Sequence, residues 1–279
     1  MYERFKPLSL IKKIDEVILN KYLGASIFEI DDYIKIKFIS LKYIFLNNNL
    51  ENIVINIDQQ NLYNLELQRS NKKKNSEEKF LYFSKATLKK ENKSYDIKIR
   101  IKGDRTIHWY DKDQSSYKID LRGDERIWGL EEFSVQKPIT RNYIYEQVFH
   151  KLLEANKLIS LKYFFINLSL NDTNQGIYAV EEGFSKELVE RNKRRNGPIF
   201  GLEERLGTKY PNVVYDLYSK EYWKKNHNEL VKNAFIKLDK LKSKKVNIGE
   251  IFELEKWAKF FAIIDLSSTL HGSISKSVK

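Results

Sequence analysis

Residues 95–102 constrain the fold most, because apolar and charged side chains alternate along them without a break. The apolar members are Tyr95, Ile97, Ile99 and Ile101, and the charged members are Asp96, Lys98, Arg100 and Lys102. Successive side chains of a β-strand point to opposite faces of its sheet. This segment therefore predicts a half-buried strand with a core face and a basic face, and Gly103 is expected to end it.

Further strands are expected on both sides of this one. Apolar runs bounded by turn-forming residues favour strands at 53–57, 80–88, 117–121, 163–170 and 176–180. The last two are separated by 171–175, Asn-Asp-Thr-Asn-Gln, which has the composition of a hairpin turn.

Helical spacing of apolar residues is expected before and after these strands. An amphipathic helix is predicted over 1–24, and a short helix over 58–67 with Asp58 as its N-cap. Three more helical segments are predicted: one that Thr140 could cap, 184–194, and most of the chain from 221 onward.

Strands followed by helices predict an α+β fold. We expect an antiparallel-sheet lobe that holds one packed helix, followed by a mostly helical part. The expected domains are an N-terminal extension at 1–49, the sheet lobe at 50–205, and the start of a helical part at 206–279.

The charge favours anionic partners, because 50 Lys and Arg against 38 Asp and Glu leave a formal net charge of +12. A solvated lysine-rich surface is the alternative explanation. The lack of cysteine excludes disulfides, thiolate nucleophiles and zinc–thiolate sites. No apolar run approaches the ~20 residues that cross a bilayer, and no signal-peptide core is evident, so we expect no membrane span and a cytoplasmic location.

The order of the pieces suggests phosphate chemistry. A phosphoryl-transfer lobe needs a loop that covers the phosphates, a strand lysine that neutralises them and a helix glutamate that holds the lysine. The chain offers the turn at Gly103, then Lys118 on a strand and Glu146 on a helix, with Glu181 after the hairpin. The Walker A loop and the motifs of ordinary protein kinases are absent from the sequence.

Residues 99–104 (IRIKGD) and 115–119 (SSYKI) resemble the R-x-KG…KKSYKI core of the CotH kinase family, which comprises atypical kinases related to a bacterial spore-coat protein. The similarity continues through 129–133, then through Arg141-Asn142 with Glu146, which match the family's R-N helix. It reaches 176–181 (GIYAVE), which matches the signature G-x-Y-x-x-E. The resemblance covers 50–205 well and 255–279 loosely.

The resemblance implies an atypical kinase-like fold that binds ATP and passes phosphate to a protein or another hydroxyl acceptor. In it, Lys118 would be the nucleotide-phosphate lysine and Glu146 its helix partner. Glu181 would mark the hinge beside the base, and Arg141 is given a structural rather than a phosphate role. The phosphate-side strand and turn would consist of Arg100, Lys102 and Gly103.

Two departures from the family pattern bear on catalysis. Ser115-Ser116 stands where the family has a lysine, and no Asp or Glu follows Asp265. Asp265 is the candidate catalytic residue, with a buried and capped helix residue as its alternative role. Because no metal ligand is assigned in this chain, Mg²⁺ or Mn²⁺ is expected only with residues beyond Lys279. We therefore expect a truncated domain that transfers no phosphate by itself.

Other function classes remain open from the sequence. The first is a pseudokinase that binds a nucleotide or phosphate without turnover. The second is a basic nucleic-acid-binding protein, which is disfavoured because the aromatics fall at core-like spacings and no nucleic-acid signature is present. Glycosidase chemistry is disfavoured too, because Glu181 and Glu182 are adjacent and would point to opposite faces of a strand.

Overall fold

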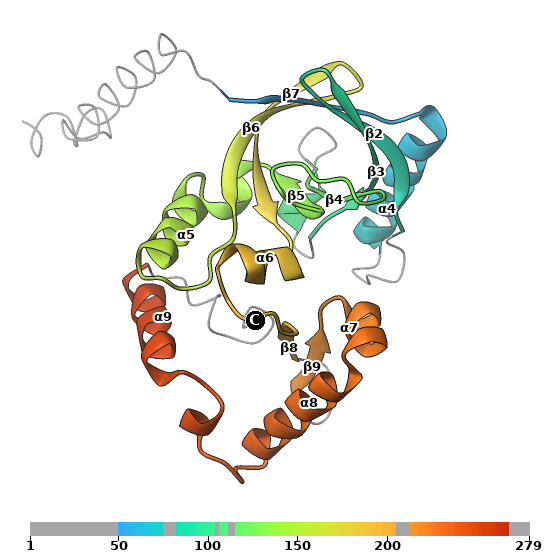
Figure 1. Ribbon diagram of the computed structural model, residues 1–279. Helices are drawn as coiled ribbons and strands as arrows, with labels where there is room; N and C mark the ends of the chain where they lie inside the picture. The colour runs from blue at the N-terminus through green and yellow to red at the C-terminus, as the bar shows by residue number, and fades with distance from the viewer. Residues whose placement is uncertain (1–49, 75–81, 104–105, 111–114, 205–212, 268–279) are drawn as a thin grey trace, which may run out of the picture. The chain divides into compact units, whose positions relative to one another are not determined.

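The computed structural model describes residues 50–74, 82–103, 106–110, 115–204 and 213–267 (Figure 1). The chain divides into two compact units, Met1–Leu50 and Glu51–Lys279, and the described helices and strands all belong to the second. The helix expected at 1–24 lies outside the described residues, and the three-part division expected from the sequence stays a prediction.

The second unit begins with seven barrel strands and two long helices. The strands are β1 (Asn52–Asn56), β2 (Ser84–Lys90), β3 (Lys93–Ile101), β4 (Tyr117–Leu121), β5 (Glu132–Gln136), β6 (Tyr163–Leu170) and β7 (Thr173–Glu182). The helical elements among them are α4 (Gln59–Lys74), η3 (Thr106–His108), η5 (Pro138–Arg141) and α5 (Tyr145–Ala155). The chain continues through α6 (Lys186–Arg191), β8 (Phe200–Glu204), β9 (Val213–Leu217), α7 (Lys220–Asn226), α8 (Asn228–Lys242), η6 (Ile248–Glu250) and α9 (Leu254–Leu266).

The seven strands form a closed barrel in the order β1-β2-β3-β4-β5-β7-β6. All neighbouring pairs are antiparallel except one: β1 also pairs with β6 in parallel, which closes the sheet. The predicted α+β fold with an antiparallel-sheet lobe of the kinase type is therefore wrong. Alternation along a strand shows its two faces, but it does not show which strand will pair with each of its edges.

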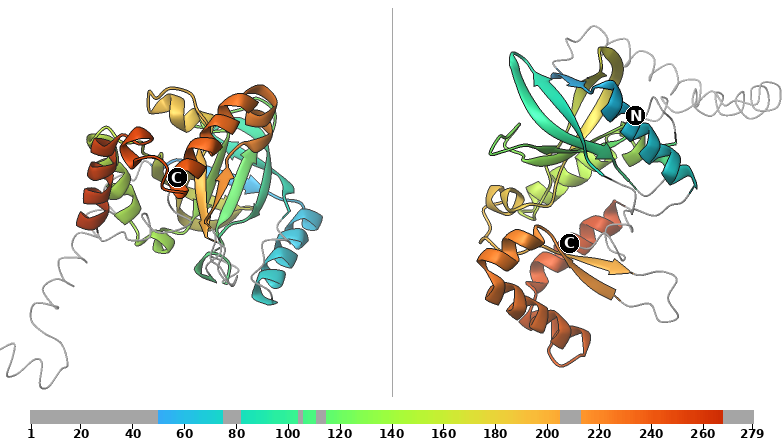
Figure 2. Two further views of the ribbon diagram at one scale, coloured as in Figure 1. Left: turned by 90° about the horizontal axis from the view of Figure 1, so that it is seen from below. Right: turned by 90° about the vertical axis from the view of Figure 1, so that its right-hand side faces the viewer.

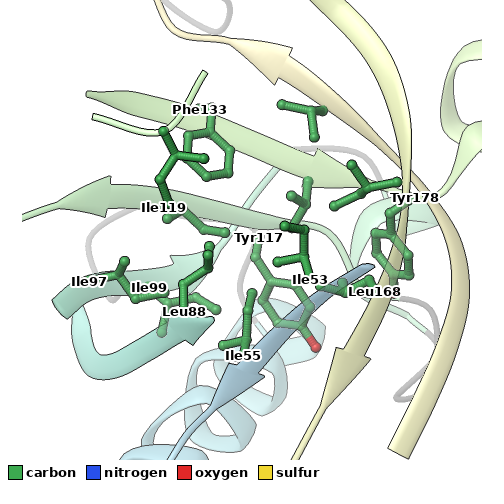
Figure 3. Packing of buried hydrophobic residues seen from close by; sticks show 14 of the residues in the cluster. Ile53, Ile55, Leu88, Ile97, Ile99, Tyr117, Ile119, Phe133, Leu168 and Tyr178 are labelled. Carbon is green, nitrogen blue, oxygen red and sulfur yellow. The ribbon is translucent and has the colours of Figure 1, made fainter. Parts of the chain in front are cut away.

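The core fills the inside of this barrel. Ile97, Ile99 and Ile101 of β3 are fully buried, as their alternation predicts. They meet apolar side chains from every other barrel strand, including Ile53, Ile55, Leu88, Ile119, Phe133, Leu168 and Tyr178 (Figure 3). The opposite faces of β2, β3, β4 and β5 carry polar and charged side chains, whereas the outer faces of β6 and β7 also carry Phe165 and Ile177.

Asn171 joins the closing strands. Its side-chain oxygen accepts a hydrogen bond from the Ile57 backbone N–H at 2.7 Å, and its side-chain nitrogen donates to the Ile57 carbonyl at 2.9 Å. Asn171 and Asp172 also form the tight turn between β6 and β7, with φ of 44° and 62°. Positive φ at both central residues is typical of a type I′ hairpin, so the predicted hairpin is confirmed with a shorter turn.

The helix predicted after Asp58 is confirmed and is longer than expected. The Asp58 carboxylate accepts a hydrogen bond from the Asn61 backbone N–H at 2.8 Å, as an N-cap does. Leu62 and Leu65 of α4 pack against the barrel core. Gln68 on the same helix accepts a hydrogen bond from the Ile101 backbone N–H at 3.3 Å. This bond satisfies the backbone N–H of Ile101, the last residue of β3, which lies beyond the end of the pairing with β2.

Beyond the barrel, a two-stranded antiparallel sheet of β8 and β9 was not predicted from the sequence. The helices expected after residue 221 are present as α7, α8 and α9. Helix α9 packs beside α5 (Figure 2). Ile263 of α9 is buried against Leu153 and Leu158. Among the described residues, none of the helices combines the length and the apolar character that a membrane crossing requires.

Candidate functional site

Polar side chains line up across the outer face of the barrel. The strand registers place one residue from each of five strands directly opposite the next: Arg100, Lys118, Ser134, Glu181 and Tyr163. Directly opposite residues on one sheet face lie about 5 Å apart at Cβ, so their side chains can interact. The row therefore brings groups together that are far apart in the sequence.

A largely buried ion pair lies at this row. The Lys102 Nζ is 2.7 Å from Glu181 Oε1, and the two side chains are only 19% and 15% exposed. Gln136 donates from Nε2 to Glu181 Oε2 at 2.6 Å, and its own Oε1 accepts a bond from Lys102 Nζ at 3.3 Å. Both oxygens of the Glu181 carboxylate are thus satisfied by two neighbouring side chains.

Arg141 approaches the same carboxylate from η5. Its Nε lies 3.6 Å from Glu181 Oε2, beyond hydrogen-bond distance, and its side chain is 30% exposed. It donates no hydrogen bond to any of the residues described by the structure. We use the name Glu181 cluster for Lys102, Gln136, Arg141 and Glu181 together.

The cations of the cluster decide the charge state of Glu181. Burial alone would raise the pKa of this carboxyl, but the charges of Lys102 and Arg141 and the hydrogen bonds from Lys102 and Gln136 outweigh it and lower the pKa to about 2. Burial lowers the pKa of Lys102, and the Glu181 charge opposes that shift. Glu181 is consequently ionised across the neutral and mildly acidic range.

Helix α5 and strand β6 supply a second layer beside the cluster. Glu146 Oε1 lies 3.5 Å from His150 Nε2, and the His150 ring stacks on Tyr163 at 6.0 Å between centroids. Burial raises the pKa of Tyr163 and the carboxylates of Glu181 and Glu146 raise it further, whereas the Gln136 side chain and the charge of Arg141 lower it. No hydrogen bond of ordinary geometry from a described residue reaches the buried Tyr163 hydroxyl, so its contact with Gln136 is weak.

The ion pair expected between Lys118 and Glu146 does not form. Lys118 Nζ instead pairs with Glu132 Oε2 at 2.9 Å on the adjacent strand. Arg100 is turned away from the cluster as well, with its guanidinium carbon 5.4 Å from the centroid of the Phe83 ring. Of the residues singled out from the sequence, the structure joins Lys102 to Glu181 and places Glu146 near both.

Gly103 is required by the loop that follows β3. It has a φ of 91°, and a Cβ added there would lie 2.5 Å from the ring of His108. His108 is buried and its Nδ1 lies 3.0 Å from the Ser116 hydroxyl. The loop thus folds back over Gly103 and fixes the end of the strand that carries Lys102.

We expect Gly103→Ala to lower the free energy of unfolding by roughly 2–4 kcal/mol, because positive φ and a steric clash add together. The control is Gly123→Ala, since Gly123 has a φ of 70° but open space around its Cβ position. Urea unfolding of both variants measures the difference. Equal losses of stability in the two variants would show that the His108 ring can move aside without a cost in free energy.

Asp265, the candidate catalytic residue, lies in the last turn of α9. Its side chain is exposed, so the alternative role as a buried and capped helix residue is wrong. Its carboxylate forms no ion pair with any residue whose placement is described. A catalytic role for Asp265 stays a prediction.

The described part of the chain contains no group of three or more His, Asp or Glu side chains placed to hold a metal ion. Within the Glu181 cluster, the carboxylate is already engaged by Lys102 and Gln136. The expectation that Mg²⁺ or Mn²⁺ needs further residues stays a prediction.

Gln136 was missed from the sequence, and Arg141 was assigned a structural role. The alternation of Glu132, Ser134 and Gln136 with Phe133 and Val135 marks β5 as a strand with a polar face. That signal was sufficient to find Gln136.

Comparison with known proteins adds no family: neither a protein-family model nor a curated protein sequence matches the chain. The likeness to CotH kinases therefore stays a prediction that rests on the short motifs alone.

Proposed function

We propose that the Glu181 cluster binds the phosphates of ATP, in a CotH-like kinase that passes phosphate to a protein or another hydroxyl acceptor. The observation that carries the proposal is the largely buried ion pair between Lys102 and Glu181. The proposal concerns ligand and chemistry, and not the kinase-type fold, which the closed barrel contradicts.

The pair has the form that phosphate chemistry requires. A lysine that contacts phosphates must be held in place, and in protein kinases a carboxylate does this through an ion pair. Glu181 fulfils that role for Lys102, and Gln136 fixes the other carboxylate oxygen. Lys102 also lies directly before Gly103, at the end of β3. Lys102 thus takes the part that the sequence suggested for Lys118.

A protein that binds nucleotide or phosphate without turnover is the second candidate. It is favoured by the engagement of the Glu181 carboxylate, whose two oxygens are held by Lys102 and Gln136. That carboxylate is not free to hold a metal ion in this arrangement. Transfer of labelled γ-phosphate from ATP to a generic protein acceptor, with Mg²⁺ or Mn²⁺ present, separates the two candidates.

We expect Lys102→Met to weaken the binding of a fluorescent ATP analogue at low salt by at least about tenfold, because a charged contact to phosphate is lost. Methionine keeps much of the apolar stem of lysine, which limits the effect on packing. Lys118→Met is the matched comparison, since Lys118 pairs with Glu132 outside the cluster.

Three outcomes are informative. A loss of nucleotide affinity in Lys102→Met alone supports the Glu181 cluster as the phosphate site. A loss of nucleotide affinity in Lys118→Met alone would show that the phosphates bind at β4, as the sequence suggests. Wild-type protein that binds no nucleotide would overturn the proposal. Thermal unfolding of each variant checks that it is folded at the assay temperature.

A further inference from the structure

Arg141 has unused binding capacity at the Glu181 cluster. Both oxygens of the Glu181 carboxylate already accept hydrogen bonds, one from Lys102 and the other from Gln136. Arg141 approaches only to 3.6 Å through Nε. Since it makes no hydrogen bond with the described residues, the forked end of its guanidinium group is available to a ligand.

The backbone presents this side chain in a defined position. Arg141 ends the short helix η5, which begins at Pro138 and is braced by the Thr140 hydroxyl, a donor to the Lys137 carbonyl at 2.7 Å. The next two residues, Asn142 and Tyr143, both adopt left-handed conformations with φ of 51° and 60°. Positive φ is ordinary for an asparagine but rare for a bulky residue such as Tyr143, and such strain tends to accumulate where a side chain must be held for binding.

A second observation points to a ligand at the same place. The Tyr163 side chain is buried, and its hydroxyl makes only a weak contact with Gln136, because no hydrogen bond of ordinary geometry from a described residue reaches it. Tyr163 lies directly opposite Glu181 in the pairing of β6 with β7, which places its side chain beside the cluster. A buried polar group without a full hydrogen bond costs about 1–3 kcal/mol, so a bound polar ligand or water that satisfies it is favoured.

We infer that Arg141 is a second phosphate-binding residue, which makes two parallel hydrogen bonds to the oxygens of a bound phosphate while Lys102 stays paired with Glu181. A planar guanidinium fork matches two phosphate oxygens, whereas an ammonium group acts as a point charge. Arg141 would therefore make affinity depend on the number of phosphates in the ligand. The inference rests on the proposed function, because it assigns the ligand contact within that site.

The test compares ATP, AMP, adenosine and inorganic pyrophosphate as probes, each titrated by calorimetry into the whole chain. We expect Arg141→Ala to weaken ATP and pyrophosphate binding at least about tenfold and to leave adenosine unchanged. Arg141→Lys keeps the charge but not the fork, so it should restore only part of the affinity. Lys151→Ala is the charge control, because Lys151 on α5 is 72% exposed and pairs with Glu154.

The outcomes distinguish this inference from the proposed function. If wild-type protein binds ATP and Arg141→Ala binds it equally well, Arg141 is not a ligand contact while the nucleotide site stands. Full rescue by Arg141→Lys would also overturn the inference, since charge alone would then suffice. If the wild type binds neither ATP nor pyrophosphate, both proposals fail.

Discussion

Glu181→Ala is expected to lower the free energy of unfolding by roughly 3–5 kcal/mol, because it leaves the largely buried ammonium of Lys102 without its counter-ion. Arg141, which also approaches this carboxylate, would then repel Lys102 without the Glu181 charge to offset the repulsion. Urea unfolding followed by circular dichroism measures the loss. A variant as stable as the wild type would show that water solvates Lys102 fully.

The matched control replaces both partners. Lys102→Met combined with Glu181→Leu removes the charges together and fills a similar volume. Because the desolvation cost of a buried pair offsets most of its attraction, this double variant should regain most of the lost stability. If it is as unstable as Glu181→Ala, the loss comes from packing and not from an uncompensated charge.

The same ion pair predicts that the free energy of unfolding depends on pH in the acid range. The pKa of Glu181 is about 2 in the folded chain against 4.5 for an unperturbed glutamate. A carboxyl group with a lowered folded-state pKa contributes stability that is complete above the unfolded value and is lost as the pH falls toward the folded one. The contribution is about 3 kcal/mol and should disappear between pH 4.5 and 2. Glu181→Gln cannot titrate there, so its unfolding curve should change less over this range.

Tyr178→Ala is the second large effect expected. Tyr178 is fully buried inside the barrel (Figure 3), where its hydroxyl donates to the Ser115 carbonyl at 3.1 Å. The Lys137 ammonium lies 4.7 Å from the centroid of its ring. Removing a buried aromatic side chain leaves a cavity, and the expected loss is about 3–5 kcal/mol.

Tyr178→Phe separates the ring from the hydroxyl. It keeps the ring and removes one buried hydrogen bond, so a loss of about 1–2 kcal/mol is expected. Chemical denaturation of the two variants side by side gives both numbers. Equal losses would mean that the hydroxyl bond to the loop, and not the filling of the barrel, makes Tyr178 important.

The sequence predicted the strands better than their arrangement. Strands β4 and β6 have the predicted bounds, and the alternation of β3 gave its buried and charged faces. The cap at Asp58 was also correct. These features depend on local order along the chain, which periodicity and capping chemistry report directly.

Barrel closure depends instead on contacts between distant segments. The pairing of β1 with β6 joins Asn52 to Asn167, and no local pattern in either segment distinguishes an edge that stays open from one that pairs. Strand β5 was missed, because no strand was predicted between 121 and 163 although residues 132–136 alternate. Thr140 does not cap α5 either: it lies inside η5, and α5 begins only at Tyr145.

The candidate site was predicted in part. Lys102, Glu146 and Glu181 were each singled out from the sequence, but the one predicted pair, Lys118 with Glu146, does not form. The order of the strands keeps Lys118 away from this site. Glu181 pairs with Ser134 and Ser134 pairs with Lys118, so β5 and β7 lie between β4, which carries Lys118, and β6. The long side chain of Lys102 reaches Glu181 from the end of β3, an approach that motif order does not reveal.

The parallel contact between β1 and β6 also sets the order in which the chain can fold. Strand β1 gains its antiparallel neighbour β2 early, but its other edge must wait until Asn167 and Asn171 have left the ribosome. Translation at roughly 5–20 residues per second makes that delay on the order of ten seconds. During this time the exposed edge of β1 can pair with other chains, and closing so long a loop slows the final step. Barrel closure is thus the late, aggregation-sensitive event in the biogenesis of this protein.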